Sequence, residues 1–227
     1  MDQNNFPLNI AETISKNESL HKYLNHFLTL TKTWDLPQTP SNYAFNQHFV
    51  SPEFLTHIRE FVDVSDDGNK FFAETLENRS NYINIKKKVE DERSSTFQDI
   101  QSIVMESLAK HLNKNGRTAN TFENPEIRCH LSGAFVYPPG SFVNWHTNND
   151  APGHRLYMAH ADEIGKSFFR YLDADTGEII TDFDKPGWNF RHFIVDPRKP
   201  FWHCVYSDTT RFSLGYNIKL SALNKTA

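Results

Sequence analysis

Residues 201–214, FWHCVYSDTTRFSL, decide the fold class predicted for this chain. Aromatic and β-branched residues fill two runs, 201–206 and 211–219, and the polar turn Ser207-Asp208-Thr209 lies between them. Short runs of this composition, bounded by residues that favour turns, are typical of β-strands. The two runs are therefore predicted to be consecutive short strands.

The same pattern extends backwards along the chain to about residue 127. Turn signals recur at Pro138-Pro139-Gly140, Pro152-Gly153, Asp175-Thr176-Gly177 and Lys185-Pro186-Gly187. Between these turns the predicted strands lie near residues 127–137, 142–148, 155–160, 167–172, 178–181 and 189–195. About eight short strands in so short a stretch predict a jelly roll or a barrel.

The first half of the chain has the three- and four-residue apolar spacing of amphipathic helices. One apolar stripe consists of Leu20, Tyr23, Leu24, Phe27 and Leu28. A second follows Ser51-Pro52-Glu53, which supplies a capping residue, a proline in the first turn and an early acid. A third helix is predicted to start near Ser95 or Thr96 and to end at Gly116.

The two periodicities predict one α+β domain with a mainly β core. Residues 1–125 are expected to form a mainly helical elaboration, and residues 126–222 the jelly roll or barrel. The helices are expected to pack on one outer face of the jelly roll, since each presents a single apolar stripe. A chain of 227 residues is long enough to bury such a core.

Composition excludes several classes of partner. The formal net charge is -4, which argues against an electrostatic grip on nucleic acid. No stretch approaches the roughly 18 apolar residues that span a bilayer, and the first residues lack a basic and apolar leader. Two cysteines, Cys129 and Cys204, make a disulfide framework unexpected. We therefore expect a cytoplasmic protein without nucleic-acid or membrane partners.

Two of the eleven histidines, His146 and His203, differ from the rest in their surroundings. Each directly follows a tryptophan inside a predicted strand, where solvent exposure is an unexpected role for an imidazole. Neutral imidazoles are common ligands of Fe(II) and similar cations. Arg211 follows His203 by eight residues, and a planar guanidinium is suited to holding a carboxylate.

The second half, over about residues 127–220, resembles the Fe(II)/2-oxoglutarate-dependent oxygenases, which share a double-stranded β-helix (jelly-roll) core, so the resemblance implies this core for residues 126–222. In their prolyl-hydroxylase-like branch, the segment that leads to the first metal ligand is similar to Tyr137-Pro138-Pro139-Gly140 followed by His146. The distal segment is similar to His203 followed by Arg211-Phe212-Ser213. The order of these pieces along the chain is more specific than any one of them.

This resemblance implies a role for each matched residue. His146 and His203 would bind Fe(II), and Arg211 would pair with the far carboxylate of 2-oxoglutarate, assisted by Ser213 and Tyr137. With O₂, such enzymes convert 2-oxoglutarate to succinate and CO₂ and hydroxylate a C–H bond. By analogy with the nearest branches, the substrate is expected to be an amino acid, free or within a peptide.

Asn148 departs from the pattern, because the third ligand is usually an Asp or Glu two residues after the first His. Residues i and i+2 share a strand face, so the Asn148 side chain is still expected to point at the metal, as a weak ligand or by holding a water. Asp150 is the alternative third ligand, but it lies about 13 Å along an extended strand from His146. Asn148 is the favoured option.

The aspartyl/asparaginyl-hydroxylase-like branch uses two histidines without a carboxylate. There an arginine shortly after the first histidine also contacts the cosubstrate, and Arg155 lies at a similar distance from His146. Three alternative functions stay open. They are a non-catalytic jelly-roll binding protein, a halogenase, and a cupin-type metalloenzyme that does not use 2-oxoglutarate.

The direction of the Arg211 side chain depends on how the last two strands are joined. If residues 201–206 and 211–219 form a hairpin, a loop of three or five residues puts Arg211 on the face of His203. A loop of four residues would turn it outward. In that case Arg155, Arg170 or Arg191 would have to hold the cosubstrate.

Overall fold

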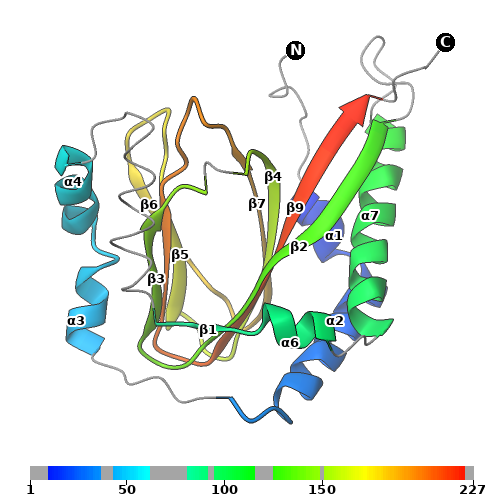
Figure 1. Ribbon diagram of the computed structural model, residues 1–227, viewed down its shortest axis with the longest axis horizontal. Helices are drawn as coiled ribbons and strands as arrows, with labels where there is room; N and C mark the ends of the chain where they lie inside the picture. The colour runs from blue at the N-terminus through cyan, green and yellow to red at the C-terminus, as the bar shows by residue number, and fades with distance from the viewer. Residues whose placement is uncertain are drawn as a thin grey trace.

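Two antiparallel sheets face each other at the centre of the computed structural model (Figure 1). One sheet has five strands in the order β1-β2-β9-β4-β7, and the other has four in the order β3-β8-β5-β6. This two-sheet arrangement is the predicted jelly roll. The residues that the structure describes are 10–36, 43–61, 81–91, 95–115, 125–148 and 151–222.

All eight predicted strands are confirmed, each within a few residues of its expected bounds. The five-stranded sheet contains β1 (Ile83–Asn84), β2 (Pro125–Tyr137), β9 (Arg211–Ala222), β4 (Gly153–Ala161) and β7 (Gly187–Val195). The four-stranded sheet contains β3 (Ser141–His146), β8 (His203–Ser207), β5 (Ser167–Leu172) and β6 (Ile179–Phe183). Among the strands that the structure describes, only the two-residue β1 was not predicted, because it lies in a polar stretch without a clear period.

The last two strands do not form a hairpin. Strand β8 pairs with β3 and β5, whereas β9 pairs with β2 and β4 in the opposite sheet. Residues 208–210 carry the chain across, and hydrogen bonds from Ser207 and Asp208 hold the start of this crossing. Ser207 Oγ donates to the Thr209 carbonyl over 2.6 Å, and Asp208 N–H donates to the Lys166 carbonyl over 2.7 Å.

One helical layer covers the outer face of the five-stranded sheet. It consists of α1 (Ile10–Ser15), α2 (Glu18–Thr31), α6 (Lys86–Asp91) and α7 (Ser95–Asn115). The predicted stripe of α2 is buried at Leu20, Leu24 and Phe27, and Asn17 caps this helix by accepting the Leu20 N–H. The predicted start of α7 is confirmed, and Gly116 lies outside the described residues.

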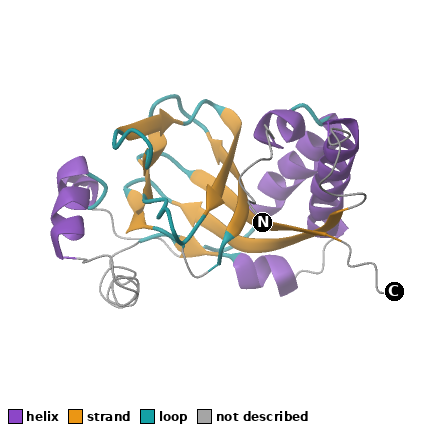
Figure 2. Ribbon diagram, turned by 90° about the horizontal axis from the view of Figure 1, so that it is seen from above, coloured by secondary structure: helices purple, strands orange, loops and turns teal. Residues whose placement is uncertain are grey.

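The other helices in the described ranges, α3 (Tyr43–His48) and α4 (Pro52–Phe61), lie on the opposite side of the molecule (Figures 1 and 2). They pack on the outer face of the four-stranded sheet, where Phe54 and Leu55 join a core with Trp145. The expectation that all helices share one outer face is therefore wrong. The predicted cap of α4 is present, since Ser51 Oγ accepts the Phe54 N–H over 3.1 Å.

The outer core also explains two residues beside the histidines. Trp145 and Cys204 are fully buried against α3 and α4, on the face away from His146 and His203. Trp145 Nε1 donates to the Ser51 carbonyl over 2.9 Å, which ties β3 to the start of α4. Within the described ranges, no helix combines the length and the apolar character needed to cross a membrane.

A second histidine pair, His154 and His192, joins β4 to β7 away from the jelly-roll interior. Nδ1 of His154 and Nε2 of His192 are 2.9 Å apart, and the rings are nearly parallel. Burial lowers the pKa of His154, and burial together with the charge of His154 lowers the pKa of His192 to about 4. Both rings are therefore neutral in the folded protein at pH 7.

This pair is expected to make folding stability fall in mild acid. In the unfolded chain the His192 imidazole takes up a proton near pH 6.5, whereas in the folded chain it resists protonation until about pH 4. Stability is thus complete above pH 6.5 and is lost as the pH falls toward 4, by up to about 2 kcal/mol after allowance for partial exposure. Urea unfolding at pH 7.0 and 4.5 measures the loss. His192→Gln should reduce it, and an unchanged pH dependence in that variant would contradict the assignment.

Candidate functional site

His146 and His203 meet inside the jelly roll although they are far apart in the sequence. They are directly paired across β3 and β8, and their ring centroids are 4.0 Å apart. Val143 and His146 are three positions apart on β3, so in a regular strand they would face opposite sides. A register shift between them lets Val143 and His146 both face the interior. The two imidazoles are thus close enough to bind one ion together.

The backbone fixes the proton positions of both rings. Nδ1 of His146 lies 2.7 Å from the Asn144 carbonyl, and Nδ1 of His203 lies 2.9 Å from the Phe201 carbonyl. A carbonyl oxygen only accepts, so each Nδ1 carries the proton and each Nε2 presents a lone pair. Such orientation of the ring by a backbone carbonyl is typical of histidines that bind a metal.

The surroundings of His203 also keep its ring neutral. Its side chain is fully buried and contacts Phe169, whose ring centroid is 5.3 Å away. Burial, the neighbouring His146 and the positive charge of Arg155 together hold the pKa of His203 well below its usual range, outweighing the Phe201 carbonyl. A neutral imidazole is the form that binds a cation.

Asn148 lies beside this pair, but a turn rather than a strand places it there. Strand β3 ends at His146, and Asn148 has a φ of 55°, in the left-handed region that Asn tolerates better than most residues. Its side chain folds back so that Nδ2 is 3.3 Å from both His203 Nε2 and the Tyr157 hydroxyl oxygen. The amide donates to the Nε2 lone pair that a cation would use.

These residues fit a cation held by two imidazoles and one weak neutral ligand. Among the described residues, no group of three or more His, Cys, Asp or Glu side chains is arranged to hold a metal. His146 and His203 nevertheless supply two lone pairs on neighbouring rings, and the carboxamide of Asn148 lies against His203. Asp150, the alternative third ligand, lies outside the described residues.

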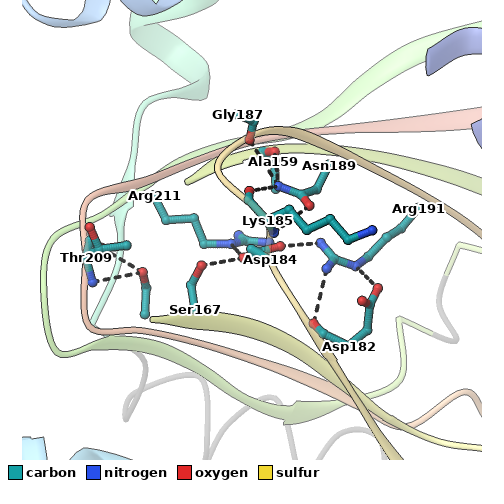
Figure 3. Close-up of polar contacts among 11 residues, drawn as sticks. Ala159, Ser167, Asp182, Asp184, Lys185, Gly187, Asn189, Arg191, Thr209 and Arg211 are labelled. Carbon is teal, nitrogen blue, oxygen red and sulfur yellow. Dashed lines mark hydrogen bonds and ion pairs between the residues drawn. The ribbon is translucent and has the colours of Figure 1, made fainter. Parts of the chain in front are cut away.

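A buried ion network surrounds Arg211 on the interior side of the five-stranded sheet (Figure 3). Its Nε donates to Asp184 Oδ2 over 2.8 Å, and the Ser167 hydroxyl donates to the same oxygen over 2.5 Å. The other oxygen of Asp184 accepts from Arg191 Nη1 over 2.7 Å, and Arg191 also binds Asp182. Asp184 therefore holds two guanidinium groups at once.

Arg211 points inward because of the alternation along β9. Phe212 and Leu214 belong to the core under the helical layer, so Arg211 and Ser213 face the interior. The Arg211 guanidinium lies over the Tyr137 ring, with 5.2 Å between its Cζ and the ring centroid. Its Nη1 is buried and has no hydrogen-bond partner among the described residues. One donor of this cation is thus left for a ligand.

Asp184 and Ser167 are parts of the site that the sequence did not indicate. Burial alone would raise the pKa of Asp184, but Arg211, Arg191 and the Ser167 hydroxyl outweigh it and hold that pKa below the usual range. Asp184 follows the exposed Phe183 and therefore resembles a surface acid in the sequence. Of the other arginines considered, Arg170 lies on the outer face, bonded to Thr181 and to the Val50 carbonyl.

Arg155 and Tyr157 come from β4 and complete the interior near His203. Arg155 is buried, and its guanidinium donates to the carbonyls of Ala151 and His154. Burial raises the pKa of Tyr157, so its hydroxyl stays protonated beside Asn148. Gly215 is paired with Tyr157, and a Cβ at position 215 would be 3.0 Å from the Tyr157 ring. A residue larger than glycine at this position would therefore crowd the ring.

Comparison with known proteins gives weak likenesses. No family model matches the chain. Methionine–tRNA ligases of Janthinobacterium sp. (strain Marseille) and Methylibium petroleiphilum are 34% and 33% identical over 76 residues. These matches cover 32% of this chain, which spans only 11% of the length of either ligase. They do not assign the chain to a family.

Two of the similar solved structures are oxygenases. A Pseudomonas putida prolyl-4-hydroxylase is 18% identical, with a TM-score of 0.38 over 59% of this chain and 75% of that one. A 2OG-Fe(II) oxygenase family oxidoreductase from Burkholderia pseudomallei is 13% identical, with a TM-score of 0.35 over 55% of this chain and 53% of that one. A cysteine peptidase from Thevetia peruviana latex scores 0.28. None of these scores reaches 0.5, so function must be inferred from the side chains.

Proposed function

We propose that this chain is a non-haem Fe(II)- and 2-oxoglutarate-dependent dioxygenase that hydroxylates a C–H bond of an amino acid or peptidyl residue. The observation that carries the proposal is that the rings of His146 and His203 lie side by side, with Asn148 against His203 and with each histidine Nδ1 bonded to a backbone carbonyl. The resemblance of the motif to this enzyme superfamily supports the same conclusion. Bound iron and 2-oxoglutarate would supply O₂ activation coupled to formation of succinate and CO₂.

The side chains divide the work between two ends of the interior. The Nε2 atoms of His146 and His203 would bind the cation, and the Asn148 amide would ligate it or hold a water at the third position. Arg211 Nη1 would bind the distal carboxylate, with the hydroxyls of Ser213 and Tyr137 as further donors. Burial raises the pKa of Tyr137, which keeps this hydroxyl protonated as a donor.

Arg155 would contact the cosubstrate at the end nearer the metal. Its charge already acts on both neighbours, because it adds to the fall in the pKa of His203 and opposes the rise that burial causes in the pKa of Tyr157. Because Arg155 and Arg211 lie on different strands, one near each end of the interior, a dicarboxylate is a better match for the pair than a monocarboxylate. The low exposure of both arginines would strengthen their hold on an anion.

The proposal is tested by succinate formation from 2-oxoglutarate in the presence of Fe(II), O₂ and ascorbate. We expect the full chain to release succinate, and Arg211→Ala to release far less. A cupin-type enzyme that does not use 2-oxoglutarate would keep its activity in Arg211→Ala. Absence of succinate, together with absence of Fe(II) binding in anaerobic calorimetry, would instead favour a non-catalytic jelly-roll binding protein. Chlorinated product in chloride buffer would indicate a halogenase.

Asn148→Asp is expected to strengthen metal binding by about tenfold or more, because a carboxylate is a better ligand for Fe(II) than a carboxamide. Aspartate also tolerates the left-handed backbone at this position, so the fold should be kept. Anaerobic titration with Fe(II), or with Mn(II) as a substitute, measures the change. Equal metal affinity in Asn148→Asp and the parent chain would show that residue 148 does not reach the ion.

A further inference from the structure

Four partly buried aromatic side chains border the histidine pair, and we call them the aromatic collar: Tyr157, Tyr171, Phe193 and Phe201. The His203 ring centroid lies 5.3 Å from that of Phe193 and 5.4 Å from that of Phe201. Phe193 and Phe201 stack at 4.5 Å, and Tyr171 extends the row at 5.5 Å from Phe201. The collar thus leads from the buried His203 toward the surface.

The collar predicts what kind of group lies next to the reacting centre. Unlike the buried Phe169 behind them, its four rings keep part of their surface accessible. Aromatic rings that are already offset or edge-on to each other present further faces and edges to another ring. Binding sites combine such apolar walls with a few placed polar groups. An aromatic side chain is therefore the best match for this wall.

Asn217 supplies the placed polar group. It lies on the interior face of β9, directly paired with Arg155 on β4. Its side chain is 7% exposed, and its Oδ1 is buried without a hydrogen-bond partner among the described residues. Buried acceptors in folded proteins are nearly always satisfied, so this oxygen points to a donor that a ligand brings.

The charge of Arg155 limits which donor this can be. A guanidinium on the paired residue disfavours a second positive charge at Asn217, since like charges in a buried setting repel strongly. The ammonium of a free amino acid is therefore a poor match. A neutral N–H, such as that of a peptide bond, can donate to Asn217 Oδ1 without being repelled by the Arg155 guanidinium.

We propose that the substrate is a peptide segment that places an aromatic side chain against the collar and donates a backbone N–H to Asn217 Oδ1. This inference rests on the proposed function. The proposed function left two substrate classes open, a peptidyl residue and a free amino acid, and the inference selects the peptidyl residue. Phe193 and Phe201 would determine the side-chain preference, and Asn217 would determine the preference for a peptide backbone.

Calorimetric titration of the full chain with three probes tests the proposal. The probes are the blocked tripeptides Ac-Ala-Phe-Ala-NH₂ and Ac-Ala-Lys-Ala-NH₂ and free L-phenylalanine. Each is titrated anaerobically with Fe(II) and 2-oxoglutarate present, and again without them. We expect the phenylalanine tripeptide to bind at least about tenfold more tightly than either other probe. Equal or tighter binding of lysine tripeptide or free phenylalanine overturns the proposal.

Variants separate the two contacts. Phe201→Ala should weaken binding of the phenylalanine tripeptide about tenfold, whereas Phe183→Ala, on the outer face of the other sheet, should not change it. Asn217→Leu should weaken tripeptide binding, and Asn217→Asp should improve binding of free phenylalanine by adding a carboxylate for its ammonium. Thermal unfolding of each variant confirms that it is folded. Unchanged affinities in both folded Asn217 variants would overturn the role of this residue.

The failure of this inference can be told apart from failure of the proposed function. Succinate formation without any preference among the three probes would leave the oxygenase assignment intact and overturn the peptide inference alone. Conversely, tight binding of the phenylalanine tripeptide without Fe(II) binding would overturn the oxygenase assignment. The collar would then be the peptide site of a binding protein.

Discussion

Replacing His203 by alanine is expected to abolish succinate formation and to weaken Fe(II) binding by at least about 100-fold. Loss of a residue that merely orients a metal ligand already costs about 10- to 100-fold, and His203 is proposed to be a ligand itself. Its Nε2 presents the lone pair that the Asn148 amide approaches. Anaerobic calorimetry with Fe(II), alongside the succinate assay, measures both effects.

Loss of packing must be separated from loss of the ligand. The His203 side chain is fully buried against Phe169, so alanine leaves a cavity that is expected to cost about 2–3 kcal/mol of stability. His203→Gln fills the space and still removes the imidazole, so it should also lose Fe(II) binding. His26→Ala, on the exposed face of α2, should behave like the parent chain. Parent-like Fe(II) affinity in folded His203→Gln would refute the proposed ligand.

Replacing Arg211 by alanine is expected to raise the KM for 2-oxoglutarate by about 100-fold or more. A buried charge-assisted bond to a carboxylate contributes several kcal/mol, and each 1.4 kcal/mol corresponds to a tenfold change in affinity. Stability should fall as well, because Asp184 loses one of its two cationic partners. Since Arg191 and Ser167 remain, we expect a loss of about 2 kcal/mol, below the 3–5 kcal/mol typical of a fully broken buried pair.

A double variant distinguishes the anchoring role of Arg211 from its structural role. In Arg211→Ala combined with Asp184→Asn, the carboxylate that lost its partner is gone, so stability should partly recover. Affinity for 2-oxoglutarate should stay low, because the donor to the distal carboxylate is still missing. Urea unfolding and steady-state kinetics measure the two quantities. Recovery of both together would mean that Arg211 acts only through folding.

The strands were predictable because alternation and turn residues are local properties of the chain. The location of the helices was not. The stripe through Phe54 and Leu55 shows that α4 buries one face, but it does not show which sheet receives that face. The apolar stripe of α2 has the same character and packs on the other sheet. Which of two similar surfaces a helix covers depends on the path of the whole chain, and periodicity does not encode it.

The candidate site was predictable in its residue types more than in its geometry. Asn148 lies beside His203, but it reaches this place through a left-handed turn rather than along the strand face from which the sequence predicted it to point at a metal. Arg211 points inward because β9 belongs to the sheet that faces the sheet of His203. In a hairpin, the only connection considered from the sequence, the two strands would lie in the same sheet. The ion pair between Arg211 and Asp184 joins residues 27 positions apart, and no local sequence pattern predicts it.

The crossing at residues 208–210 has a consequence for how such a chain can diverge. Three residues separate the strand of His203 from the strand of Arg211, and hydrogen bonds from Ser207 and Asp208 hold the end that follows β8. An insertion here would change the spacing between the two halves of the site, whereas the exposed turn at Asp175 can lengthen without touching either half. Descendants of this chain are therefore free to acquire new substrates through their outer turns while this short bridge keeps its length.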